Sequence, residues 1–151
     1  MKQINGDLIQ LAKDGRFDAI IHGCNCFCAM GAGIAQSVRK HFPEAHQADL
    51  NTPVGDKNKL GTYSHAQIKR NGHVFTIING YTQYDYSGVA PLVDYQAVET
   101  LFEKVSHAFS GLRIGYPKIG AGLAGGNWEK ISGIIDRALD GEDHTLVVYI
   151  K

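Results

Sequence analysis

Hydrophobic residues along the chain follow two spacings, one typical of strands and the other typical of helices. Short β-type runs predict four buried strands, at residues 2–5, 17–23, 112–119 and 144–151. Apolar residues spaced three or four apart predict three helices that each bury one face, at residues 33–42, 93–109 and 127–139. Pro43 is expected to end or bend the first of these helices, because proline lacks the backbone N–H that a helix interior uses.

A β-hairpin is predicted within residues 61–80, where two β-prone runs are joined by Asn71-Gly72. Hairpin partners are antiparallel, whereas strands that alternate with helices are usually parallel. The pattern therefore predicts an α/β fold, a three-layer α/β/α sandwich on a mixed, mostly parallel, six-stranded sheet. The chain has no repeat, linker or low-complexity tract, so residues 1–151 are expected to form a single domain.

Composition narrows the class of protein. The chain has 15 basic and 15 acidic residues, and this balance argues against a protein that binds nucleic acid mainly through electrostatic attraction. No apolar run approaches the roughly 18 residues that span a bilayer, and the N-terminus lacks the apolar stretch of a signal peptide. The three cysteines lie within five positions, an odd count that suits reduced thiols. We therefore expect a cytoplasmic protein with no membrane partner.

A metal site or a nucleophilic thiol is considered first, because a histidine and three cysteines follow one another at two-residue spacing: His22, Cys24, Cys26 and Cys28. Alternate strand residues lie about 6.6 Å apart, whereas two thiolates on one zinc ion are at most about 4.6 Å apart. A nucleophilic thiol of the phosphatase type needs a nearby arginine, and the next is Arg39. We therefore expect no metal and interpret the cysteines as small buried apolar residues, with a zinc or redox switch as the alternative.

Two glycine-rich segments, 30–35 and 119–126, each lie between a predicted strand and a predicted helix. Such junctions expose backbone N–H groups at the positive end of a helix dipole, and glycine lets an anion approach them. The second segment also matches GxGxxG, but too little chain follows it for a Rossmann half. Two such loops suggest a clamp on two linked phosphates, and the alternative is a pair of tight turns.

Asp7 follows Gly6 at the end of the predicted strand 2–5. One interpretation is an ordinary turn or helix N-cap. The other is that its carboxylate accepts a hydrogen bond from an exocyclic amine, such as that of adenine.

Taken together, these motifs resemble a macrodomain across nearly the whole chain. The resemblance rests on "GDL" near the start and, in order, on "IIHGCNCFCAMGAGIAQSVRKHFPEA" (20–45), "INGYTQ" (78–83) and "YPKIGAGLAGGNWEKI" (116–131). Within macrodomains, the chain is most similar to the branch of ADP-ribose-1''-phosphate phosphatase and the terminal ADP-ribose protein glycohydrolase. The resemblance implies a monomer that binds ADP-ribose or ADP-ribose-1''-phosphate at the C-terminal ends of the strands, without a cofactor.

The resemblance also implies roles for individual residues. Asp7 would accept the adenine amine with Leu8 beside it, Asn25 would lie near the distal ribose, and Tyr81 or Tyr84 would pack on adenine or at the cleft rim. The diphosphate would lie between the two loops, formed by Gly31, Ala32, Gly33 and Ile34 and by Ile119, Gly120, Ala121, Gly122 and Leu123.

The chain departs from the glycohydrolase, whose lysine and aspartate correspond here to Asn79 and Ala124. An asparagine amide is not basic, so protein-glutamate hydrolysis by that route is not expected. What remains is a hydrolase, a phosphatase of ADP-ribose-1''-phosphate or an enzyme acting on a related ADP-ribosyl ester. In it His22 would act as acid or base, and Asn25 or His22 would hold the attacking water. The alternative for His22 is a strand-end histidine satisfied by backbone. The alternative for the protein is a non-catalytic module that binds ADP-ribose, free or on ADP-ribosylated macromolecules.

Overall fold

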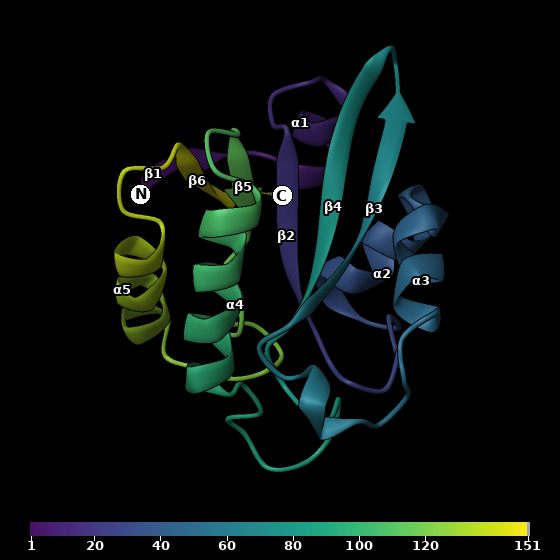
Figure 1. Cartoon of the computed structure of the whole chain (residues 1–151), viewed down its shortest axis with the longest axis vertical. Coiled ribbons are helices and arrows are strands. Elements are labelled where there is room, and N and C mark those ends of the chain that lie inside the picture. Colours follow the sequence, from purple (N-terminus) through teal and green to yellow (C-terminus); the bar gives the residue numbers. More distant parts are fainter. Residues whose placement is uncertain (151) are drawn as a thin grey trace.

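One mixed sheet runs through the molecule, with strand order β1-β6-β5-β2-β4-β3 in the computed structural model, which describes residues 1–150 (Figure 1). Its strands are β1 (Lys2–Asn5), β2 (Ala19–Cys24), β3 (Tyr63–Arg70), β4 (His73–Tyr81), β5 (Ile114–Tyr116) and β6 (His144–Val148). Every neighbouring pair is parallel except the β3–β4 hairpin. The predicted six-stranded, mostly parallel sheet is confirmed, while Lys151, the end of the predicted strand 144–151, lies outside the described residues.

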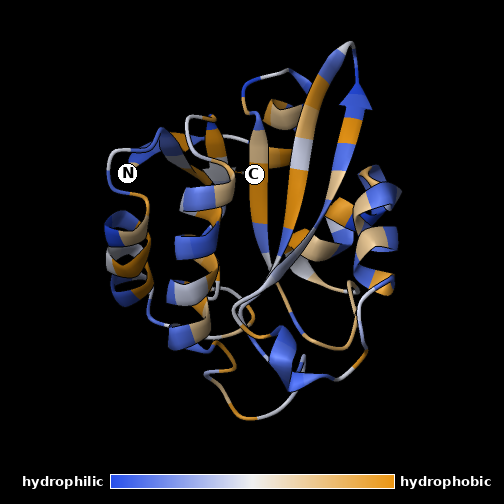
Figure 2. Cartoon of the chain, viewed as in Figure 1, coloured by the Kyte–Doolittle hydropathy of each residue, from blue (hydrophilic) through white to orange (hydrophobic). Residues whose placement is uncertain are grey.

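Helices cover both faces of the sheet, as the predicted three-layer sandwich requires. They are α1 (Leu8–Lys13), α2 (Gly33–His41), α3 (Pro43–Leu50), α4 (Tyr95–Ala108) and α5 (Trp128–Ala138), with a short 3-10 helix, η1, at Lys57–Lys59. α4 and α5 bury their apolar sides in one core, and α1, α2 and α3 bury theirs in another. Figure 2 shows hydrophobic residues along β2 and on the helix sides that face the sheet.

The three predicted helices are confirmed to within two residues at each end, but the hydrophobic pattern did not predict α1 or α3. Pro43 begins α3 instead of only ending the helix before it, because the first turn of a helix does not use the N–H that proline lacks. The predicted strand 112–119 contracts to β5, which stops before Pro117. Within residues 1–150, no helix is long and apolar enough to cross a membrane.

β2 sends alternate side chains to the two faces of the sheet. Ile21 packs in the core under α4 and α5, whereas Ile20 packs in the core under α1, α2 and α3. His22 therefore faces the same side as Ile20.

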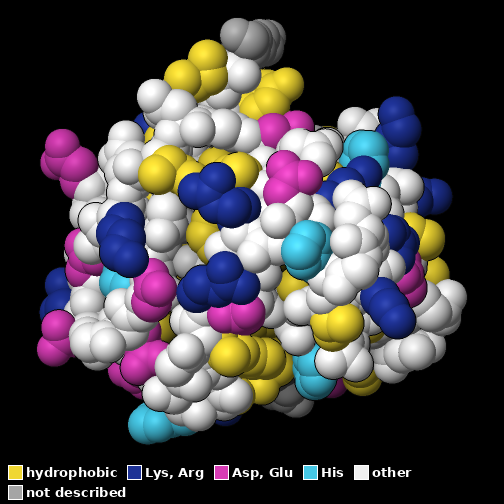
Figure 3. Space-filling view, turned by 90° about the horizontal axis from the view of Figure 1, so that it is seen from above, with side chains coloured by type: hydrophobic (Ala, Val, Ile, Leu, Met, Phe, Trp, Pro, Cys, Tyr) yellow, Lys and Arg dark blue, Asp and Glu magenta, His cyan; other side chains and the backbone are white. Residues whose placement is uncertain are grey.

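Seen from above, basic and acidic side chains are interspersed on the surface, in keeping with the balanced charge (Figure 3).

Candidate functional site

A cleft of about 1050 Å³ opens where the parallel strands β1, β6, β5 and β2 end. In α/β sheets this is the edge where ligands usually bind. Twelve of the residues that the sequence assigned to ligand binding line this cleft: Asp7, Leu8, Asn25, Gly31, Ala32, Gly33, Ile34, Ile119, Gly120, Ala121, Gly122 and Leu123. The fold thus brings together residues from opposite ends of the chain.

The N-terminus of α2 faces the cleft without a side-chain cap. The helix begins at Gly33, and the preceding residue, Ala32, has no polar side chain to accept from its first N–H groups. By contrast, α1, α4 and α5 are capped by Asp7, Asp94 and Asn127. The first turn of α2 therefore presents backbone donors and a positive dipole end to the cleft, which suits an anion.

The second loop faces the first and is closed by its own backbone. Gly126 N donates to the Gly120 carbonyl oxygen at 2.7 Å, and Gly120 has a left-handed φ of +75°. A Cβ placed on Gly33 would lie 3.4 Å from Leu123 Cδ1, so the tips of the two loops nearly touch. The two glycine loops therefore face each other across the cleft, and their role as a clamp on two linked phosphates stays a prediction.

Asp7 performs the structural role considered for it and leaves room for the functional one. Its Oδ1 accepts from the backbone N–H of Ile9 at 2.9 Å and of Gln10 at 3.3 Å, which caps α1. The other carboxylate oxygen takes no part in the cap, and the side chain lies at the cleft wall. The two interpretations of Asp7 are compatible.

The tyrosines at the cleft differ from those proposed from the sequence. Tyr81 is 1% exposed and donates to Asp49 Oδ1 at 2.7 Å, and Tyr84 donates to the Gly55 carbonyl oxygen. Neither lines the cleft, whereas Tyr86 and Tyr149 do. Tyr81 cannot pack on a ligand in the cleft because its side chain is buried and its hydroxyl donates to Asp49 of α3. Tyr149 directly follows β6, which pairs with β1 and so brings Tyr149 to the cleft. The sequence alone does not reveal this pairing of the two ends of the chain.

Asn25 holds the turn just before the first glycine loop as well as lining the cleft. Its Oδ1 accepts from the N–H groups of Phe27 and Ala29, and its Nδ2 donates to the Ala29 carbonyl oxygen at 2.8 Å. One N–H of the amide remains for a ligand or a water, since an amide nitrogen carries two protons.

His22 stands apart from the cleft, which corrects the expectation that it lies beside the ligand. It is 1% exposed, and its Nε2 donates to Asn79 Oδ1 at 2.7 Å. The Asn79 amide donates in turn to the Ala45 carbonyl oxygen and to Ser64 Oγ. Strand alternation explains the difference, because the His22 side chain points under α3 instead of toward the strand end. Burial lowers the pKa of His22, which keeps the ring neutral.

His22 is expected to make stability depend on pH. Because its folded-state pKa lies below the ordinary value of 6.5, the unfolded chain binds the proton more readily. Stability should therefore fall as the pH drops below about 6.5, with His144 adding to the effect because burial also lowers its pKa. Urea unfolding at pH 7.5 and 5.5 would measure this. His22→Gln keeps a hydrogen-bond donor but does not titrate, so its unfolding free energy should fall less between the two pH values. An equal fall in both proteins would contradict the assignment of the pH dependence to His22.

The three cysteines are buried and free, as the sequence predicted. Cys24 touches the cleft, but burial raises the pKa of its thiol well above the ordinary range. A protonated thiol is a poor nucleophile, so Cys24 is not suited to covalent chemistry.

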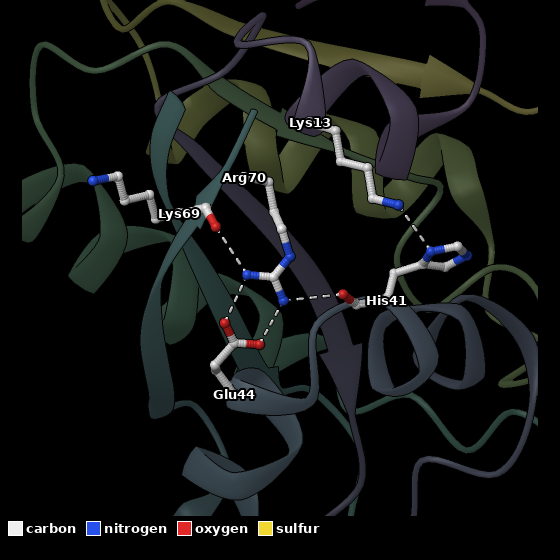
Figure 4. A network of polar contacts seen from close by, with 5 residues as sticks. All are labelled: Lys13, His41, Glu44, Lys69 and Arg70. Atoms are coloured by element: carbon white, nitrogen blue, oxygen red, sulfur yellow. Dashed lines mark hydrogen bonds and ion pairs between the residues drawn. The ribbon is translucent and has the colours of Figure 1, made fainter. Parts of the chain in front are cut away.

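His41, the last residue of α2, also lines the cleft, and neighbours hold it in place (Figure 4). Lys13 Nζ lies 3.0 Å from His41 Nδ1. An ammonium only donates, so Nδ1 accepts and the ring carries its proton on Nε2. Arg70 donates to the His41 carbonyl oxygen while making two hydrogen bonds to Glu44. His41 is thus a polar cleft residue held by Lys13 and Arg70, which do not line the cleft themselves. The sequence did not reveal this network because its residues come from four separate elements.

Comparison with known proteins adds to this geometry. No family model matches the chain. The chain is 38% identical over 141 residues to the uncharacterized 17.5 kDa protein in the tk-vs intergenic region of Enterobacteria phage T4, a match that covers 90% of this chain and 88% of that protein. A shorter match, 44% identical over 46 residues, covers 30% of this chain and 21% of the ADP-ribose 1''-phosphate phosphatase of Aspergillus oryzae.

Solved structures resemble the chain over its whole length. The macrodomain of Mycobacterium tuberculosis DarG superposes with a TM-score of 0.76 at 20% identity, covering 99% of this chain and 97% of that one. Thermosipho africanus DarTG in complex with ADP-ribose superposes with a TM-score of 0.75 at 16% identity, covering 100% of this chain and 42% of that one.

Proposed function

This chain has the macrodomain fold and belongs to the same family as the 17.5 kDa protein of phage T4, and from that premise we propose that it binds ADP-ribose in the cleft. The observation that carries the proposal is the uncapped N-terminus of α2 facing a second glycine loop. A similarly folded protein, Thermosipho africanus DarTG, has been solved with ADP-ribose.

The two loops would hold the diphosphate. Backbone N–H groups of Gly33 and Ile34 at the start of α2 would donate to one side of it, with the helix dipole favouring its charge. Gly120 to Leu123 would close over the other side, where glycine backbone leaves space for phosphate oxygens.

The adenine would lie beside Asp7. The carboxylate oxygen not used in the α1 cap would accept the exocyclic amine, and Leu8 and Ile9 supply apolar contact. Tyr149 is 67% exposed beside the same strand ends and offers a ring face to the base. Gly6 N donates to the Val148 carbonyl oxygen at 2.9 Å, which holds the Asp7 and Tyr149 segments together.

Asp7→Ser is expected to weaken ADP-ribose binding at least about tenfold, or 1.4 kcal/mol, because serine cannot reach the base. Serine is a good N-cap, so the stability of α1 should change by less than about 0.5 kcal/mol. Calorimetric titration should also show that the wild type prefers ADP-ribose over its hypoxanthine analogue, whose carbonyl replaces the amine. A variant that binds ADP-ribose as tightly as the wild type would count against the adenine assignment.

The finer proposal is hydrolysis of ADP-ribose-1''-phosphate or a related ADP-ribosyl ester at the Asn25 end of the cleft. Loop N–H groups would stabilise charge that develops on the phosphoryl group, and the remaining Asn25 N–H would orient a water. The partial match to the Aspergillus oryzae phosphatase supports this chemistry. His22 is not part of this proposal, because it does not line the cleft.

The alternative is a module that binds free or macromolecule-linked ADP-ribose without turnover. It is favoured by the position of His22, the acid or base suggested by the sequence, which is buried and does not line the cleft. Phosphate release from ADP-ribose-1''-phosphate separates the two functions. Release above background that disappears in a loop-blocked variant would establish the enzyme, and no release from protein that binds ADP-ribose would establish the module.

A further inference from the structure

The segment just before the first glycine loop contacts a buried lysine through Cys26 and Cys28. Lys59, in η1, is 6% exposed, and its Nζ donates to the Cys26 carbonyl oxygen at 3.1 Å. The same nitrogen lies 3.7 Å from Cys28 Sγ and 4.6 Å from the centre of the Tyr81 ring. Lys59 does not line the cleft, so it cannot contact a ligand there directly.

The segment that Lys59 holds has an unusual backbone. Cys28 adopts a left-handed φ of +58°, which side chains other than glycine, asparagine and aspartate rarely take. Cys28 Sγ donates to the Asp49 carbonyl oxygen at 3.1 Å, and the Cys26 carbonyl oxygen also accepts from Gly55 N. A strained conformation persists only where its surroundings enforce it, and here these contacts act together with the Asn25 hydrogen bonds to Phe27 and Ala29.

An acidic residue belongs to the same buried cluster as Lys59 and is linked to it through Tyr81. Asp49 is 1% exposed, and its Oδ1 accepts from the Tyr81 hydroxyl, whose ring lies against the Lys59 ammonium. Among the described residues, Asp49 Oδ2 has no hydrogen-bond partner. Buried charges are retained where opposite charge and hydrogen bonds accompany them, and both are present around the loop.

We propose that Lys59 is a positioning residue for the ADP-ribose site, an inference that rests on the proposed function. Its ammonium pulls the Cys26 carbonyl and the Cys28 thiol inward and so fixes the left-handed turn at Cys28. The chain that leaves this turn then enters α2 with the N–H groups of Gly33 and Ile34 aimed at the cleft. The cysteine motif is therefore the internal support of an anion-binding loop.

Lys59→Met tests the proposal, because it keeps the length of the side chain and removes its donors and charge. We expect ADP-ribose affinity to fall about tenfold and amide hydrogen exchange in residues 26–34 to accelerate about tenfold. Lys57→Met is the matched control, since Lys57 is an exposed residue of the same short helix. It should leave both measurements unchanged.

A rescue variant separates positioning from general stability. Cys28→Gly removes the cost of the left-handed backbone. Added to Lys59→Met, it should recover most of the lost affinity, whereas a general loss of packing would be deepened by a further truncation. Lys59→Gln, which retains one donor for the Cys26 carbonyl, replaces Lys59→Met should the latter not fold, and it should lose less than tenfold.

A failure of the Lys59 inference can be distinguished from a failure of the proposed ADP-ribose binding. Wild-type protein that fails to bind ADP-ribose would refute the proposed function, and the exchange rates alone would then decide whether Lys59 fixes the loop. Unchanged affinity and unchanged exchange in Lys59→Met would overturn the inference, as would an affinity loss that Cys28→Gly does not recover.

Discussion

Gly33→Val is expected to fold and to bind ADP-ribose at least about 100-fold more weakly than the wild type, a loss of about 2.8 kcal/mol. Gly33 has a φ of +59°, and a β-branched residue cannot adopt this conformation without shifting the backbone that begins α2. Its Cβ would lie 3.4 Å from Leu123 Cδ1, so the two methyl groups would fill the gap between the loops. Both effects remove the donors proposed for the diphosphate.

Gly111→Val is the matched control for this variant. Gly111 has a φ of +82° with nothing within 4 Å of an added Cβ, and it lies between α4 and β5, outside the cleft lining. It should incur a similar strain of about 1–2 kcal/mol and bind ADP-ribose normally. Calorimetry for affinity and thermal unfolding for stability would compare the two proteins. Equal affinities in the two variants would refute the clamp.

Gly126→Ala is expected to have the second large effect, on stability as well as on binding. Its Cβ would lie 2.5 Å from the Gly120 carbonyl oxygen and 2.5 Å from Val93 Cγ1. The first of these atoms is backbone and cannot move aside, so the hydrogen bond from Gly126 N to Gly120 must break or lengthen. We expect the unfolding free energy to fall by about 2–4 kcal/mol, with loss of ADP-ribose binding.

Gly122→Ala provides the comparison for Gly126→Ala within the same loop. An added Cβ at Gly122 meets nothing within 4 Å, and this glycine is not in the left-handed region. Its unfolding free energy should stay within about 0.5 kcal/mol of the wild type. Denaturant unfolding of the two variants measures the contrast, and a Gly126→Ala protein as stable as Gly122→Ala would show that the loop tolerates reshaping.

The sheet and the glycine loops were predictable because their signals are local. Asn71-Gly72 determines its hairpin through turn geometry, and the strand-loop-helix junctions at Gly33 and Gly120 follow from neighbouring periodicity. α3 was missed because Pro43 is read as a terminator when the chain before it is helical, although it is equally a first-turn residue.

The site was less predictable where it depends on which face of a strand a side chain occupies. His22 and Tyr81 lie on neighbouring parallel strands and both point into a buried polar cluster. A shift of one residue in strand register reverses such an assignment, and sequence spacing does not resolve it. Tyr149 reaches the cleft only because β6 pairs with β1, a contact between the two ends of the chain.

Calorimetric titration of the wild-type protein with ADP-ribose would show whether the cleft binds this ligand. We expect saturable binding at one site per chain, which Gly33→Val abolishes and Gly111→Val retains. Folded wild-type protein that gives no saturable heat up to about 1 mM ADP-ribose, equivalent to about −4.1 kcal/mol, would contradict this expectation.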